Sequence, residues 1–234
     1  WPVAKINHLH VIGGLDITQY DRLENNKYAA NLAADYRIES LRGLGVRIGS
    51  DIFYQKNQNV LNQKYINLQH RRDFAHGLIH AIQTDFRLTN NKYPISPEGN
   101  GLTQSVTIGI SKNLSSSIQL GAAIYIDKNT TSTTSLSFNT KSVSIYTKKY
   151  FHPFSSIIQF NIMKADRSYK GIDELFGIFR EYKRFVASIS ITRDLKFFGL
   201  YPSVELGSEK FFSNIPINSY DRRFLNIQLK KSFN

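Results

Sequence analysis

Residues 117–126, Ser-Ile-Gln-Leu-Gly-Ala-Ala-Ile-Tyr-Ile, carry aliphatic side chains at the even positions and polar or small ones at the odd positions. Leu102–Lys112 repeats the pattern, with Val106, Ile108 and Ile110 on one side of the chain. A period of two residues indicates a β-strand with one face in an apolar environment and the other in a polar one. The alternation recurs along almost the whole chain, so we predict an all-β protein.

Twelve segments carry this alternation, and many approach the length of about 9–11 residues that a tilted strand needs to cross a bilayer. We predict strands at residues 8–20, 28–39, 44–55, 65–73, 78–88, 102–111, 117–126, 142–150, 155–164, 183–193, 203–210 and 224–233.

The predicted connections alternate in length. The odd-numbered ones, such as 21–27, 89–101 and 127–141, are long and polar, whereas the even-numbered ones, such as 40–43 and 112–116, are mostly short. Long connections at one end and tight periplasmic turns at the other are typical of outer-membrane barrels. We therefore predict that residues 1–234 form a transmembrane antiparallel β-barrel of about 12–14 strands in the bacterial outer membrane, with long extracellular loops and short periplasmic turns.

The composition fits this prediction. The 234 residues include 30 Lys and Arg, 18 Asp and Glu and no cysteine, for a formal charge of +12. The sequence contains no run of about 18 apolar residues, so it predicts no transmembrane helix. The basic residues do not cluster on one helix face and no nucleic-acid motif is visible. We expect contact with outer-membrane lipids and lipopolysaccharide, and no nucleic-acid partner.

The polar face of the predicted strands carries ionisable residues of both signs. Charges are costly against lipid but are tolerated in a wet lumen, where they can pair across strands or line a conduit. The candidates for this lumen-facing set are Asp16, Asp35, Arg37, Glu39, Arg47, Asp51, Arg71, Asp73, Asp85, Arg87, Glu205 and Glu209.

Aromatic residues gather near the predicted strand ends, where two girdles at the head-group level are expected for a barrel in lipid. Strand proteins are also rich in aromatic residues for other reasons. The girdle predicted at the long connections is Tyr20, Tyr28, Tyr54, Tyr65, Tyr182, Phe185, Phe211, Phe212 and Phe224. The girdle predicted at the short turns is Phe74, Tyr150, Phe151, Phe154, Phe197, Phe198, Tyr201 and Phe233.

The sequence does not point to catalysis, a metal or a cofactor. His8 and His10 alternate on a strand, and His70, His76 and His80 surround one short turn. A metal site needs a convergent set of ligands, which this spacing does not establish. A hydrolase would need an activated Ser or paired acids near a His, and no spacing singles out such a set. We predict that the protein is not an enzyme and holds no metal.

One long connection is unusually apolar. Between residues 165 and 182, apolar side chains fall near helical spacing, which predicts a short helix. An apolar helix on an exposed connection would either cap the mouth of the barrel or contact a passing client protein. The side chains are Ile172, Leu175, Phe176, Ile178 and Phe179.

The C-terminal third contains two further motifs. Arg193–Pro202 places an aromatic-Gly-x-x-Pro turn between two strands. Ser213-Asn214-Ile215-Pro216 and Ser219-Tyr220-Asp221-Arg222 then precede a terminal strand with Phe233 near its end. This pattern resembles the barrel domain of the surface lipoprotein assembly modifiers (Slam), also called type XI secretion outer-membrane proteins.

The resemblance implies a translocon that moves client lipoproteins or soluble proteins, often haem- or metal-capture or host-interaction factors, to the cell surface. It implies a barrel of about fourteen strands, so two strands are either missing from this piece or hidden in residues 127–150. It also implies a preceding periplasmic helical-repeat domain. No repeat of about 34 residues is visible here, so we expect a fragment that lacks it. Phe233 resembles the signal read by the barrel-assembly machinery.

Two other functions remain open at this stage. The first is a passive porin-type solute channel, which would conduct ions without binding a client. The second is an outer-membrane enzyme.

Overall fold

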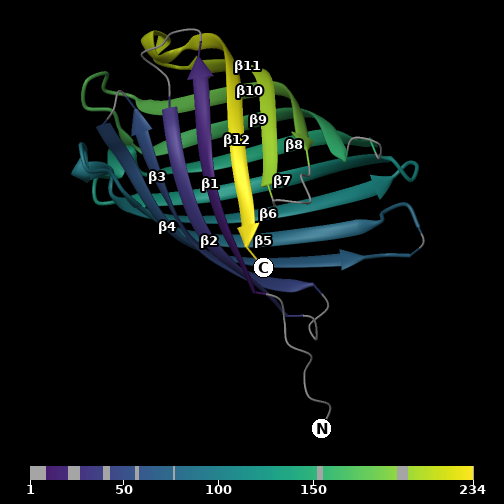
Figure 1. Cartoon of the computed structure of the whole chain (residues 1–234). Coiled ribbons are helices and arrows are strands. Elements are labelled where there is room, and N and C mark those ends of the chain that lie inside the picture. The colour runs from purple at the N-terminus through teal and green to yellow at the C-terminus, as the bar shows by residue number, and fades with distance from the viewer. Residues whose placement is uncertain are drawn as a thin grey trace.

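The computed structural model describes residues 9–20, 27–38, 43–55, 58–75, 77–151, 155–193 and 200–233. Twelve antiparallel strands form one closed barrel, in which each strand pairs with its neighbours in sequence (Figure 1). The strands are β1 (Leu9–Tyr20), β2 (Lys27–Ile38), β3 (Leu44–Gln55), β4 (Gln58–Asp73), β5 (Ala81–Lys92), β6 (Gly101–Asn113), β7 (Ile118–Thr131), β8 (Phe138–Phe151), β9 (Ser156–Ile172), β10 (Phe179–Arg193), β11 (Leu200–Ser213) and β12 (Tyr220–Phe233).

The ring closes between the first and last strands. β1 pairs with β12 from Val11 opposite Phe233 to Tyr20 opposite Phe224. Closure leaves no strand edge unpaired, which is what the hydrocarbon region of a membrane requires. All twelve predicted strands are present. Residues 127–150 hold only the end of β7, a connection and most of β8, so no further strand is hidden there.

The outer face of the barrel is apolar. Ile124, Ile145 and Leu206 are each more than half exposed, whereas the buried residues are mostly small or polar. This distribution is the reverse of that in a soluble domain, where large aliphatic side chains are buried. It fits a wall whose outer surface faces lipid and whose inner surface is polar.

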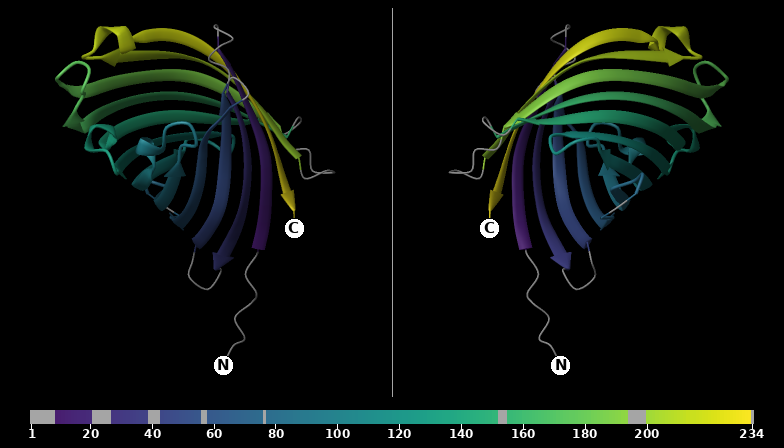
Figure 2. Two further views of the ribbon diagram at one scale, coloured as in Figure 1. Left: turned by 90° about the vertical axis from the view of Figure 1, so that its left-hand side faces the viewer. Right: turned by 90° about the vertical axis from the view of Figure 1, so that its right-hand side faces the viewer.

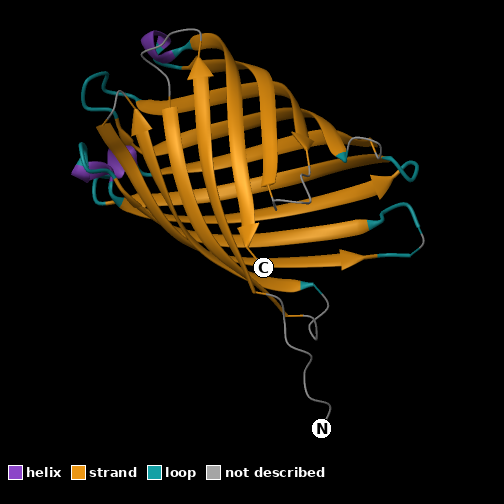
Figure 3. Cartoon of the chain, in the orientation of Figure 1, coloured by secondary structure: helices purple, strands orange, loops and turns teal. Residues whose placement is uncertain are grey.

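The two ends of the barrel differ. In Figures 1 and 3, β1 begins and β12 ends at the same end, which also holds the β4–β5 and β6–β7 turns. The opposite end holds the odd-numbered connections, whose described residues include three short 3₁₀ helices, η3 (Pro97–Gly99), η4 (Thr134–Leu136) and η6 (Pro216–Asn218). The side views in Figure 2 show steeply tilted strands running between these ends. No helix within the described ranges is long and apolar enough to cross a membrane.

The strands extend further than predicted at the odd-connection end. The connections 93–100, 132–137, 173–178 and 214–219 are shorter than predicted because the strands from β5 to β12 gain residues there. The prediction followed the apolar alternation, which stops at the membrane edge. Beyond that edge the hairpins continue their backbone pairing with polar side chains, because water replaces lipid around them. The long extracellular segments are therefore largely protruding hairpins.

The predicted helix near residue 175 is wrong. β9 continues to Ile172, β10 begins at Phe179, and residues 173–178 form a tight turn. The Asp173 carboxylate accepts hydrogen bonds from the backbone N–H groups of Leu175 and Phe176, and Gly177 adopts a positive φ of 67°. These features close a hairpin, and the apolar spacing reflects a cluster of side chains at its tip.

Candidate functional site

The candidate site is the lumen of the barrel. A cavity of about 880 Å³ is lined by residues from β4 to β10, including Asp85, Arg87, Asp127 and Arg167. A second cavity of about 440 Å³ adjoins it and shares Asp127 and Arg167. Asp127 Oδ1 is buried and lacks a hydrogen-bond partner in the described protein, so it is available to water or a polar ligand. The lumen is therefore a polar compartment.

One wall of the lumen is built from β2 to β5. Arg47 donates a hydrogen bond of 2.7 Å to Asp35, which lies directly opposite it and is only 2% exposed. Further along the wall, Arg87 on β5 reaches across β4 to Asp51 on β3, at 3.3 Å. The Arg87 guanidinium also lies 3.8 Å from the ring centroid of Tyr65, which belongs to the strand between them. This wall contains separate ion pairs.

The opposite wall, from β8 to β12, carries a row of aromatic rings, which we term the aromatic ladder. Each of these five consecutive strands contributes one inward ring at the odd-connection end. Neighbouring centroids lie 4.7–5.4 Å apart, within the range of favourable aromatic pairs. The rings are Phe138, Tyr169, Tyr182, Phe211 and Tyr220.

Arginines cover the ladder. The guanidinium groups of Arg167 and Arg180 lie 3.8 Å and 4.1 Å from the centroids of Phe138 and Tyr169. Arg222 lies 4.5 Å from the centroid of Tyr220. Because ring faces are occupied by other rings or by guanidinium groups, the ladder acts mainly as a rigid strut of the wall.

Glu209 connects the Tyr220 ring of the aromatic ladder to two lumen arginines, Arg184 and Arg222. Its carboxylate accepts hydrogen bonds from Arg184 at 2.8 Å, from Arg222 at 3.0 Å and from the Tyr220 hydroxyl at 3.0 Å. Glu209 is 2% exposed, so its charge depends on these partners. One carboxylate thus holds three strands together.

The structure places the predicted lumen residues as follows. Asp35, Arg47, Asp51 and Arg87 meet in the two ion pairs described above, and Asp85 lines the large cavity.

The remaining predicted charges are less engaged. Arg71 pairs with Asp73 near the end of β4, where both are exposed. Glu205 faces Ser190 and Asn226 and has no ion-pair partner among the described residues. The side chains of Asp16 and Arg37, and all of Glu39, lie outside the described residues.

Sequence reasoning missed much of the second wall. Arg184, Arg222 and the rings of Tyr169 and Tyr220 were not proposed for the lumen. They occupy positions in phase with the polar face of their strands, and that phase is the signal that identifies them.

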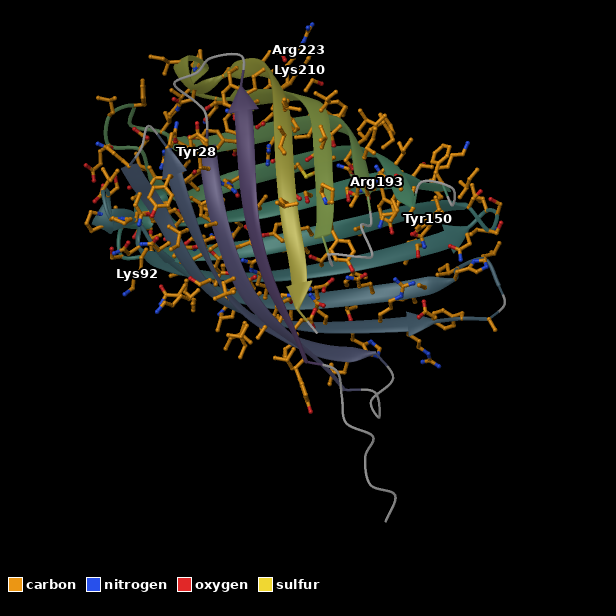
Figure 4. The ribbon with its side chains drawn as sticks, viewed as in Figure 1. Tyr28, Lys92, Tyr150, Arg193, Lys210 and Arg223 are labelled. Carbon is orange, nitrogen blue, oxygen red and sulfur yellow. The ribbon has the colours of Figure 1, made fainter. Side chains whose placement is uncertain are left out.

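The predicted aromatic girdle at the odd-connection end is only partly correct. Tyr28, Tyr54, Phe185 and Phe212 are exposed on the outer face (Figure 4 labels Tyr28). Tyr65, Tyr182, Phe211 and Phe224 instead point into the lumen, because their strand phase is that of the polar set. The Phe224 and Tyr65 rings lie over the cross-strand glycines Gly207 and Gly49, where a Cβ atom would collide with them. The side chains of Tyr20, Phe154, Phe197, Phe198 and Phe233 lie outside the described residues.

An apolar cluster occupies the tip of the β9–β10 hairpin, and we term it the apolar tip. Leu175 is 83% exposed, and its neighbours are between 40% and 54% exposed. It does not fold into the barrel mouth. The apolar tip consists of Ile172, Leu175, Phe176, Ile178 and Phe179.

The described residues contain no group of three or more His, Cys, Asp or Glu side chains that could hold a metal ion. His8 and His76, and the side chain of His10, lie outside those residues.

Comparisons with known proteins agree with this architecture. No curated protein matches the sequence. The KdgM porin in complex with disordered oligogalacturonate is similar in fold, with 11% identity, a TM-score of 0.60, and coverage of 95% of this chain and 99% of that chain. The NanC porin is similar with 10% identity, a TM-score of 0.58, and coverage of 95% and 98%. Both are porins, and these similarities support an outer-membrane barrel.

The sequence itself identifies the family. The model of the surface lipoprotein assembly modifier matches residues 50–233, which is most of the chain. It extends the resemblance first noted in the C-terminal motifs back to β3. With a closed barrel, a polar lumen and an apolar outer face, this protein of the bacterial outer membrane belongs to the surface lipoprotein assembly modifier family.

Proposed function

We propose that this barrel exports client proteins, either lipoproteins or soluble haem- or metal-capture and host-interaction proteins, to the cell surface. The family supports a role in the surface assembly of lipoproteins. The observation within the structure that carries the proposal is the apolar tip, which protrudes at the odd-connection end of the barrel.

The position of the apolar tip argues for a protein partner. It extends beyond the strand segments that cross the membrane, so lipid does not cover it. An exposed apolar cluster of this kind marks an interaction surface. Large apolar side chains grouped on a rigid hairpin are suited to a transient contact with an emerging chain. We propose that the client contacts Ile172, Leu175, Phe176 and Phe179.

Export also requires a polar route through the barrel, which we propose the lumen provides. A client segment moving past charged and hydroxyl side chains can exchange its hydrogen bonds with water for hydrogen bonds with the wall. The residues proposed to line this route are Asp35, Arg47, Asp51, Asp85, Arg87 and Glu205, together with Asp16, Arg37, Glu39 and Arg71.

The export proposal is tested in a Gram-negative host that lacks the protein. The barrel is co-produced with a candidate client lipoprotein from the same genome, and surface display of the lipoprotein is measured by protease accessibility on intact cells. We expect display only when the barrel is present. Equal display without the barrel would refute the proposal.

The contact surface is tested with a matched pair of variants. Leu175→Ser with Phe176→Ser removes two apolar side chains from the tip, and we expect display to fall about tenfold. Ile217→Ser is the control, because Ile217 is 81% exposed on the β11–β12 connection outside the apolar tip. Equal loss in both variants would indicate a general effect on folding and would contradict a specific tip contact.

A passive solute channel is the second candidate, because the two adjoining polar cavities offer a route for small ions. Planar bilayer recordings distinguish the two. A steady conductance with no client dependence in cells would favour the channel.

Assembly is also proposed to depend on the last strand. We propose that the barrel-assembly machinery recognises Phe233. Phe233→Ala should then lower the amount of folded barrel in the outer membrane, as measured by heat-modifiable migration in gels.

A further inference from the structure

Near the odd-connection end, the outer face carries one exposed cation on each of six consecutive strands, from β7 to β12. Five of them have an outward apolar side chain two residues nearer the middle of the same strand, such as Ile126 beside Lys128 and Val143 beside Lys141. They therefore mark the edge of the lipid-facing belt at the odd-connection end. Figure 4 labels two of them, on the paired strands β11 and β12, at the upper end of the barrel. The six are Lys128, Lys141, Lys164, Lys183, Lys210 and Arg223.

Three of these lysines border one groove. Lys141, Lys164 and Lys183 lie on the adjacent strands β8, β9 and β10, and with Asp166 and Glu181 they line a shallow outer hollow of about 470 Å³. We term it the lysine groove.

The lysine groove has an excess of positive charge. Asp166 is the direct cross-strand neighbour of both Lys141 and Lys183. Even so, none of the three lysines lies within 4.0 Å of a carboxylate oxygen in the described residues. Lys210 on β11 differs, because its ammonium group lies 3.7 Å from the Asp221 carboxylate. Three ammonium groups facing two carboxylates leave one positive charge unmatched and all three ammonium groups available.

The surroundings of Lys164 fix the level of the groove in the membrane. Its cross-strand neighbours are Val143 and Phe185, both on the apolar belt. A lysine in that position lays its methylene stem over the apolar wall and extends its ammonium to the polar head groups. Lys141 and Lys183 are two strands apart, roughly 10 Å, so the three ammonium groups surround a space suited to a phosphate group.

We propose that the lysine groove binds the phosphate groups of one lipopolysaccharide molecule in the outer leaflet. The odd-connection end faces the outside, because the short turns of such barrels are periplasmic. The lipid at that level is lipopolysaccharide, whose phosphates form charge-assisted hydrogen bonds with ammonium groups. The site lies on the outer face of the strands that carry the aromatic ladder. The proposal rests on the outer-membrane location and is independent of client export.

The test compares two variants that lose the same charge. Lys141→Gln, Lys164→Gln and Lys183→Gln together remove the groove cations. The control combines Lys64→Gln, Lys92→Gln and Lys112→Gln, which are outward lysines on β4, β5 and β6, the last of them beside the short β6–β7 turn. Folded protein in micelles is titrated with purified lipopolysaccharide and bound lipid is measured by native mass spectrometry. Each lysine near a head group contributes about fivefold in affinity, so we expect the groove variant to bind at least tenfold more weakly and the control to match the wild type.

Three results would overturn the proposal. The first is equal weakening in both variants, which would indicate general charge attraction. The second is equal binding of phosphatidylglycerol at the groove, which would show that any anionic lipid suffices. The third is no lipid bound by the folded wild type. Inorganic phosphate serves as a competitor, and displacement of the lipid only at concentrations far above that of lipopolysaccharide supports recognition of the whole lipid.

Discussion

The two walls of the lumen are held together in different ways. The wall from β2 to β5 relies on two separate ion pairs, Asp35–Arg47 and Asp51–Arg87. The wall from β8 to β12 relies on a continuous network, in which the aromatic ladder is joined to Arg184 and Arg222 through Glu209.

The difference concerns cooperativity. Ion pairs that share no residue are coupled less strongly than groups that share partners in one network. The first wall is therefore expected to yield more easily when the barrel changes shape, and the second to act as its stiff frame.

Loss of the Glu209 charge should have the largest effect. Glu209→Gln removes the carboxylate that Arg184 and Arg222 share, and the Arg222 side chain is only 17% exposed, so we expect a loss of about 3–5 kcal/mol in the free energy of unfolding. Urea unfolding in detergent micelles, followed by gel migration, measures it. Glu205→Gln is the control on the same strand, because Glu205 lacks an ion-pair partner among the described residues. Comparable losses of unfolding free energy in the two variants would show that Glu209 stabilises the barrel no more than Glu205 does.

The equivalent change in the first wall should be milder. Asp35→Asn removes one charge-assisted hydrogen bond, and Arg47 is 31% exposed and can turn its charge toward water. We expect a loss of about 1.5–3 kcal/mol in the same unfolding assay. A loss as large as that for Glu209→Gln would mean that the two walls do not differ in the way described.

Coupling within the ladder gives a sharper measure. A double-mutant cycle of Phe211→Leu and Tyr220→Leu should show a coupling energy of about 0.5–1.5 kcal/mol, because these rings are stacked 4.8 Å apart. A control cycle that pairs Phe211→Leu with Tyr65→Leu on the other wall should show no coupling. Coupling of similar size in both cycles would argue against a local ladder.

The smallest effect is expected where an ion pair is exposed. Arg71 and Asp73 lie 2.9 Å apart, but their side chains are 53% and 66% exposed. A cycle of Arg71→Gln and Asp73→Asn should give a coupling energy of about 0–1 kcal/mol that disappears at high salt. A larger coupling energy that does not change with salt would show that the exposure of an ion pair does not determine how much it contributes to stability.

Much of the fold could be predicted from the sequence. The twelve strands were located, and the phase of their alternation separated the apolar outer face from the polar inner face. The helix near Leu175 and part of the aromatic girdle were predicted wrongly. In the first case a turn built on Asp173 and Gly177 overrode apolar spacing in a short segment. In the second, Tyr65 and Phe211 were judged by their place near strand ends, although their phase directs them inward.

The sequence by itself determined that the chain forms strands with one apolar and one polar face, because that pattern depends only on neighbouring residues along each strand. Only the tertiary structure decided which charges meet. Arg87 finds Asp51 across an intervening strand, and Glu209 gathers Arg184 and Arg222 from two neighbours. Such partners depend on the register and inclination of strands far apart in sequence, which no local pattern specifies.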